Sequence, residues 1–209
     1  MTWSCLIILP GLVALYIAVV LWRLRVAEGR LQPLPQPPPS RPGLWMMAHR
    51  ADKRLPLQHL FLRLTPSHER WARERPELFA QRDDAGRAYC TLGAGPVDGK
   101  LVLAFNRVPD LTDPIGFEEA LPLAGPDAEN RAVAALLARV AQYPNHLAFR
   151  NWTRVTGRGF NCNSMMAALL RDCGLPWPRF VRIHMLCVGY RQRVPKREFE
   201  GPEPVKTIE

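Results

Sequence analysis

A cysteine at the start of a predicted helix and a histidine inside a predicted strand are the residues of this chain best suited to chemistry. Asn161 is a good N-cap, so Cys162 falls in the first turn of the helix that follows. The unpaired N–H groups and the positive dipole end of a helix favour a thiolate there. The thiolate is the form of cysteine that acts as a nucleophile. His59 stands in the middle of an apolar run and is the candidate base.

Both residues also have an ordinary structural interpretation. A cysteine inside a helix is usually a small buried apolar residue, and a histidine in a strand is often a packed core residue. The chain holds five cysteines and five histidines, so some pair is always available. Position alone therefore leaves open whether Cys162 and His59 react or simply pack.

The order of the two residues carries a resemblance to a known family. A strand-borne histidine, followed about a hundred residues later by Asn-Cys at a helix start, resembles the permuted papain-like (NlpC-type) superfamily. This superfamily includes lecithin retinol acyltransferase-like proteins and the PPPDE peptidases. The matching stretch is N-C-N-S-M-M-A-A-L-L-R-D-C-G-L, residues 161–175, and the resemblance covers roughly Leu55 to Leu175. It implies a small antiparallel sheet packed on the Cys-bearing helix, with the thiol facing the imidazole.

The resemblance also implies a reaction. Cys162 would attack the carbonyl of an amide, ester or thioester, while His59 takes up the thiol proton and returns it to the leaving group. The backbone N–H of Cys162 and its neighbours Asn161 and Asn163 would provide the oxyanion site at the helix start. The expected activity is that of a thiol hydrolase or acyltransferase.

Relatives often orient the histidine with a third polar residue on the next strand. Here that strand offers only Tyr89 and Thr91 as polar side chains, and neither is usual in this role. Asn106, at the end of the following strand, is the predicted substitute, although it could equally be a turn residue. The missing third residue favours an alternative, in which the domain is a non-catalytic binding or scaffold module.

The positions of strands and helices predict an α+β domain. Asp127 and Asn161 are predicted N-caps of two amphipathic helices, and Ser67 of a shorter one. Gly93-Ala94-Gly95-Pro96 and Asp98-Gly99 predict a tight turn, and residues 107–126 look loop-like. Strands are predicted over residues 55–64, 87–92, 100–105 and 180–190. Strands grouped before helices are typical of an α+β fold.

The chain begins with an uncharged apolar run from Trp3 to Trp22. Twenty helical residues span about 30 Å, the thickness of a hydrocarbon core, so residues 1–25 are predicted to be a transmembrane anchor with the bilayer as partner of residues 3–22. A cleaved signal peptide is the alternative. No Lys or Arg precedes the run, however, and no A-x-A site follows it. Arg23 and Arg25 follow the run, so the C-terminal domain is expected on the cytoplasmic side, as in a single-pass protein of a bacterial inner membrane.

Composition divides the rest of the chain. Residues 26–44 form a Pro-rich linker, expected to be a semi-rigid spacer or a docking segment for an SH3-type partner. Residues 45–190 are the predicted α+β papain-like domain. Residues 191–209 are a charged tail, expected to be disordered.

Charge and metal-binding patterns exclude several functions. The net charge is +9, but the basic residues are scattered and no nucleic-acid module is recognisable. No C-x-x-C pair exists, and His49, His68, His146 and His184 show no ligand spacing, so no metal or cofactor is predicted. The other cysteines, Cys90, Cys173 and Cys187 among them, are expected in apolar surroundings. The substrate is not predicted, because specificity depends on pocket shape.

Overall fold

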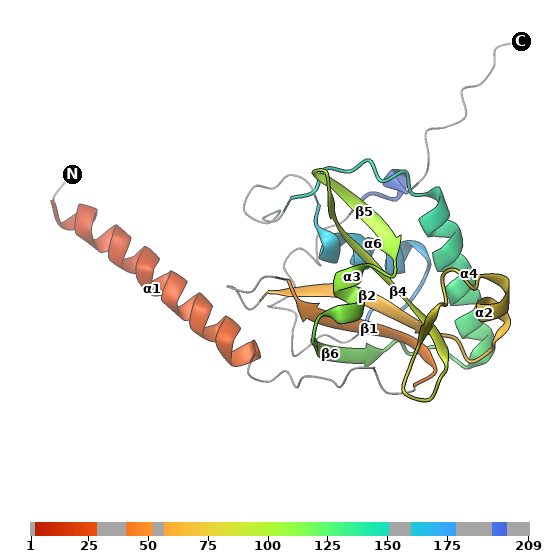
Figure 1. The fold of residues 1–209 in the computed structure, drawn as a ribbon. Coiled ribbons are helices and arrows are strands. Elements are labelled where there is room, and N and C mark those ends of the chain that lie inside the picture. The colour runs from red at the N-terminus through yellow and green to blue at the C-terminus, as the bar shows by residue number, and fades with distance from the viewer. Residues whose placement is uncertain (1–2, 29–40, 52–56, 151–159, 179–193, 200–209) are drawn as a thin grey trace, which may run out of the picture.

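Six antiparallel strands form the sheet of this α+β fold, which a computed structural model gives for residues 3–28, 41–51, 57–150, 160–178 and 194–199 (Figure 1). The strand order is β3-β4-β2-β1-β6, and β5 pairs with β4. The strands are β1 (Gly43–Arg50), β2 (Gln58–Thr65), β3 (Gln81–Arg82), β4 (Ala88–Val97), β5 (Lys100–Phe105) and β6 (Ile115–Ala120). The helices are α1 (Trp3–Glu28), α2 (Arg70–Glu74), α3 (Val108–Thr112), α4 (Pro126–Gln142) and α6 (Cys162–Asp172), with a 3-10 turn η1 (Lys196–Glu198).

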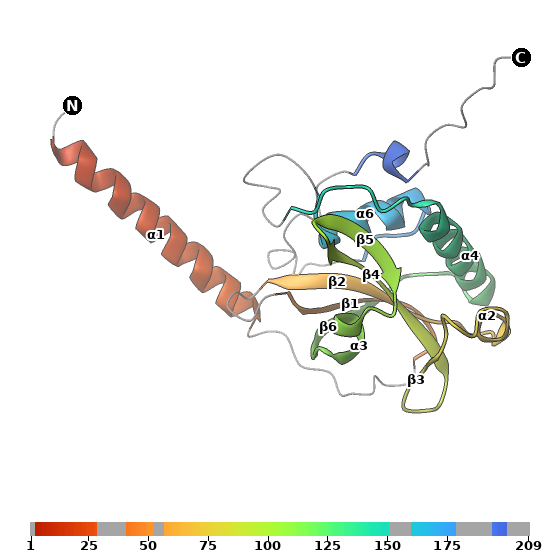
Figure 2. The same cartoon turned by 45° about the horizontal axis from the view of Figure 1, so that its top comes forward.

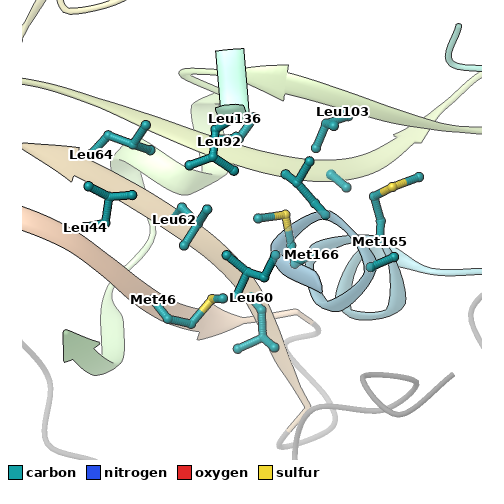
Figure 3. Close-up of a cluster of buried hydrophobic side chains, with 14 of the residues drawn as sticks. Leu44, Met46, Leu60, Leu62, Leu64, Leu92, Leu103, Leu136, Met165 and Met166 are labelled. Atoms are coloured by element: carbon teal, nitrogen blue, oxygen red, sulfur yellow. The ribbon is translucent and has the colours of Figure 1, made fainter. Parts of the chain in front are cut away.

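One face of the sheet carries the main apolar core. Side chains alternate along a strand, so every second residue of β1 and β2 points to this face, where α6 contacts β2 and β4. Met165 and Met166 of α6 lie beside leucines of β2, β4 and β5 (Figure 3). The core residues labelled there are Leu44, Met46, Leu60, Leu62, Leu64, Leu92, Leu103, Leu136, Met165 and Met166. The predicted packing of a small antiparallel sheet on the helix that begins at Cys162 is thus present.

The opposite face of β1 and β2 is also buried. Its apolar part is a small cluster formed by Met47, Phe61 and Ile115, each under 5% exposed. Because β2 is covered on both faces, the residues that alternate with its leucines are buried as well, and His59 is among them.

The pairing of β2 with β4 stops before either strand ends. The last pair is Phe61 with Gly93, and from there to Val97 β4 pairs only with β5 among the described strands. Figure 2 shows the β4–β5 hairpin leaving the plane of β2 in this region. The backbone of β2 around His59 is therefore open on its β4 side.

Four local predictions from the sequence are wrong. Ser67 and Asp127 are not N-caps, because α2 follows Glu69 and α4 begins at Pro126 after Gly125. The Gly93-Ala94-Gly95-Pro96 segment is not a turn but a continuous part of β4, and the reversal is made by Asp98 and Gly99, both with positive φ. The stretch 107–126 is not simply a loop, since it contains α3 and β6. Pro109 lies in the first turn of α3, where its fixed φ suits a helix start.

The prediction of a transmembrane helix before the α+β domain is wrong. The apolar run does form a helix, α1, but within the described residues no helix has the combined length and apolarity of a membrane span. The helix continues beyond the uncharged run, through Arg23 and Arg25 to Glu28, and so passes the predicted boundary at residue 25. The location of the remaining chain on the cytoplasmic side stays a prediction.

The predicted boundaries shift at both ends. β1 begins at Gly43, inside the range 26–44 expected to be linker. Residues 194–199 lie in the range expected to be a disordered tail, yet Val194 and Phe199 are fully buried in the core. The expected strand at 180–190 falls outside the described residues. The predicted linker and the predicted tail are each described only in part.

Candidate functional site

The start of α6 is fixed by a reciprocal cap. The Asn161 side chain accepts a hydrogen bond from the Ser164 N–H at 3.0 Å, and Ser164 Oγ accepts one from the Asn161 N–H at 2.8 Å. This capping box satisfies two backbone donors that a helix start leaves unpaired. The predicted N-cap is therefore confirmed, and Cys162 is the first residue of the helix. Its side chain is half-buried, so the sulfur is shielded but still accessible.

Asn163 joins this helix start to the open edge of β2. Its Nδ2 donates to the Gln58 carbonyl at 2.9 Å, and its Oδ1 accepts from the Leu60 N–H at 2.9 Å. The Cys162 thiol also lies 3.7 Å from the same Oδ1. The Asn163 amide thus continues the hydrogen-bonding pattern of the sheet where β4 has left it. Its side chain holds strand and helix together and is already engaged, rather than free to bind an oxyanion.

His59 lies between Cys162 and a carboxylate. The ring is 5% exposed, and its Nε2 lies 3.2 Å from Asp110 Oδ1. Burial lowers the pKa of His59, but its electrostatic interactions and hydrogen bonds with Cys162 and Asp110 outweigh burial and raise the pKa to about 9. The arrangement therefore favours an imidazolium at neutral pH, with the Cys162 side chain and the Asp110 carboxylate as its partners.

Asp110 was missed by the sequence analysis. It belongs to α3, in the stretch expected to be a loop, and is 3% exposed. Burial alone would raise its pKa, but hydrogen bonds from His49 and His59 outweigh burial and lower the pKa to about 2. Asp110 is therefore an ionised buried carboxylate, which is stable only because donors surround it.

A glycine in β4 makes room for this carboxylate. A Cβ on Gly93 would lie 2.1 Å from Asp110 Oδ2, far closer than any real contact. A glycine inside a strand often marks a close approach of another group. The Gly93 and Gly95 pair, interpreted from the sequence as a turn, was the signal that something lies against β4.

His49 completes the cluster and was also missed. It is the cross-strand partner of His59 in the β1–β2 register, and the two ring centroids are 4.7 Å apart. Its Nε2 lies 3.1 Å from the same oxygen, Asp110 Oδ1, and its Nδ1 lies 3.1 Å from the Arg50 carbonyl. Asp110 Oδ1 therefore bridges two histidines of neighbouring strands.

Arg107 lies beside the same ring nitrogen of His59 as Asp110. Its Nη1 donates to the Ala94 carbonyl at 2.7 Å and lies 3.2 Å from His59 Nε2 and 3.7 Å from Asp110 Oδ1. Nε2 cannot both donate to Asp110 and accept from Arg107. The raised pKa of His59 decides this in favour of donation to Asp110. The contact of Arg107 with the ring is then packing rather than a hydrogen bond.

Asn106, the residue predicted to orient His59, has a different environment. Its Nδ2 donates to the Leu78 carbonyl at 2.6 Å, and its Oδ1 accepts from the Thr91 N–H at 2.9 Å. Its φ is +49°, a conformation that Asn adopts more readily than most residues. Both ends of the Asn106 amide therefore hold the turn that leads out of β5.

His49, His59 and Asp110 also have the chemistry of metal ligands. Their nearest ligand atoms all lie within 4.8 Å of one another, and two imidazoles with a carboxylate are a set that zinc accepts. The guanidinium of Arg107, 3.2 Å from His59 Nε2, would stand beside the ion and repel it. A metal ligand must also be a neutral imidazole, so an ion would have to displace the proton that the raised pKa of His59 favours. The cluster fits a hydrogen-bonded histidine–carboxylate pair better than a metal centre.

Comparison of the chain with family models, with curated proteins and with solved structures found no match. The function must therefore be argued from the site itself.

Proposed function

We propose that this protein is a thiol hydrolase or acyltransferase that acts on an amide, ester or thioester. Cys162 is the nucleophile and His59 carries the proton. Asp110 orients the imidazole and stabilises its protonated form. The observation that supports this most strongly is the environment of His59, which bonds to a half-buried thiol and to a buried carboxylate and has its pKa raised to about 9. Strongly shifted pKa values that arise from specific partners of this kind are typical of functional sites.

In the first chemical step, the Cys162 thiol need not lose its proton to water beforehand. With the pair present as thiolate and imidazolium, the Cys162 sulfur forms a bond to the carbonyl carbon, and the carbonyl π electrons move to the oxygen. The backbone N–H of Cys162, at the start of α6, would stabilise that oxyanion, since the Ser164 N–H is bound to Asn161 Oδ1. Collapse of the intermediate breaks the bond to the leaving group, which takes the proton of His59.

The second step uses His59 as a base. The ring, now neutral, removes a proton from water or another acceptor as that molecule attacks the thioester carbonyl. Cys162 then leaves as a thiolate and His59 is again an imidazolium. Asp110 remains ionised throughout and stabilises the imidazolium in both resting and final states. The family resemblance remains a prediction and is not needed for this argument.

An activity-based thiol probe tests the proposal. The probe should label the wild-type protein, fail on Cys162→Ser and label His59→Ala more slowly. Cys173→Ser is the matched control, because Cys173 directly follows the same helix and is also half-buried, yet burial raises the pKa of its thiol to about 11. It should keep full labelling. Equal labelling of the wild type and Cys162→Ser would reject the proposal in favour of a non-catalytic module.

A further inference from the structure

Arg107 presents an unused part of its guanidinium beside the proposed nucleophilic pair. A guanidinium carries five N–H donors, and Arg107 uses Nη1 on the Ala94 carbonyl. Among the described residues, no protein group accepts a hydrogen bond from its Nε or Nη2. The side chain is 19% exposed, so these donors are reachable from solvent.

The position of this guanidinium is fixed by the fold. A Cβ on Gly95 would lie 2.0 Å from Nη2, so the side chain lies directly over the backbone of β4 where a larger residue would displace it. The Ala94 carbonyl holds one end of the group. Arg107 is thus a pre-positioned cation rather than a flexible surface arginine, and such positioning lowers the entropy lost when a ligand binds.

Arg107 and Cys162 flank the same imidazole. Arg107 Nη1 is 3.2 Å from His59 Nε2, and the Cys162 side chain hydrogen-bonds with that ring. A group bound by Arg107 therefore lies next to the imidazole that the proposed reaction uses.

The carboxylate beside Arg107 is already hydrogen-bonded to two histidines. Asp110, the carboxylate paired with Arg107 among the described residues, also bonds to His49 and His59, and its Oδ1 is 3.7 Å from Arg107 Nη1. A planar carboxylate matches the parallel N–H pair of a guanidinium.

From these contacts we infer that the substrate carries a carboxylate close to the scissile acyl group, and that Arg107 binds it. The inference rests on the proposed function, since it concerns the same Cys162 and His59. It specifies the substrate class as anionic acyl compounds, such as an amide or ester whose acyl or amine part bears a free carboxylate next to the reacting bond.

Two alkylating reagents of nearly equal size test it. Iodoacetate carries a carboxylate and iodoacetamide a neutral amide, and both alkylate the same thiol with loss of iodide. The rate at Cys162 is followed by mass spectrometry of the full chain with peptide mapping. The ratio of the iodoacetate rate to the iodoacetamide rate should fall about tenfold in Arg107→Gln, because a charge-assisted hydrogen bond is lost. Arg107→Lys should recover part of it.

The ratio of the two rates separates binding of the reagent's carboxylate from the reactivity of the Cys162 thiol. Any loss of thiolate in Arg107→Gln slows both reagents equally and cancels. Arg82→Gln is the matched control, because Arg82 Nη1 also donates to backbone carbonyls, those of Phe79 and Gln81. Its ratio should equal that of the wild type. An unchanged ratio in Arg107→Gln, with Cys162 still reactive, overturns the inference alone, whereas a Cys162 that reacts no faster than an unfolded thiol overturns the proposed function as well.

Discussion

Asn163 binds the backbone on both sides of His59. Its amide donates to the carbonyl of the preceding residue, Gln58, and accepts from the N–H of the following residue, Leu60. Because Cys162 is the immediate neighbour of Asn163, the distance between the thiol and the imidazole is set by one side chain that reaches from helix to strand. The geometry of the proposed pair therefore depends on a residue that takes no part in the chemistry.

Replacing Asn163 should lower both the stability of the fold and the reactivity of Cys162. Asn163→Ala leaves two buried backbone groups unpaired, each at a cost of about 1–3 kcal/mol, so the free energy of unfolding in urea should fall. Alkylation of Cys162 should also slow in the folded protein, since the helix start loses its hold on β2. Asn145→Ala is the control, because the Asn145 Oδ1 also accepts a backbone N–H, that of Leu103 at 2.9 Å. It should lose stability but keep the reactivity of Cys162; similar reactivity in both variants would argue against a positioning role.

The local part of this site could be predicted from the sequence. Asn161, Cys162 and the apolar stripe behind them specify a capped helix that packs on a sheet, and His59 lies in an apolar run that forms β2. Such features depend on residues a few positions apart, which capping and periodicity describe well.

The remaining part depends on contacts between distant segments. Asp110 reaches His59 only because the β4–β5 hairpin leads into α3, and no local pattern distinguishes it from the other acidic residues of the chain. His49 shares a register with His59 through a pairing that the sequence analysis did not anticipate. The one available signal was the pair Gly93 and Gly95, whose missing side chains leave space for Asp110 and Arg107.

Asp110→Asn should slow thiol labelling without unfolding the protein. The amide keeps the shape of the carboxylate but removes the charge that stabilises the imidazolium of His59. Hydrogen bonds to charged groups contribute about 1.5–3 kcal/mol, so the rate at Cys162 should fall roughly tenfold to a hundredfold. Asp113→Asn provides the control, because Asp113 Oδ2 lies 3.4 Å from His49 Nδ1 and its side chain is 45% exposed. Equal rates in Asp110→Asn and the wild type would remove Asp110 from the mechanism.

Gly93→Ala should destabilise the protein through Asp110. The added Cβ would lie 2.1 Å from Oδ2 of a short side chain that has little freedom to move, and overpacking of this kind costs about 1–3 kcal/mol. The cost should shrink when Asp110→Ala is introduced in the same chain, because the clashing atoms are then absent. Urea unfolding of the wild type, both single variants and the double variant measures this coupling. Additive losses would mean that Gly93 serves the strand itself and not the carboxylate.

The titration of His59 provides the most direct test of the charges in the site. Carbon and proton resonances of the imidazole should titrate with a midpoint of about 9 in the wild type, and Cys162→Ala and Asp110→Asn should each lower it. His59→Gln identifies the resonance. Since the folded pKa is above the ordinary value of 6.5, the stabilisation from this group is complete below about pH 6.5 and is lost as the pH rises through 9. Unfolding free energy should therefore decline over that interval in the wild type and decline less in His59→Gln. A wild-type midpoint at or below 6.5 would mean that burial dominates, that the ring rests neutral, and that Cys162 and Asp110 do not act on it as proposed.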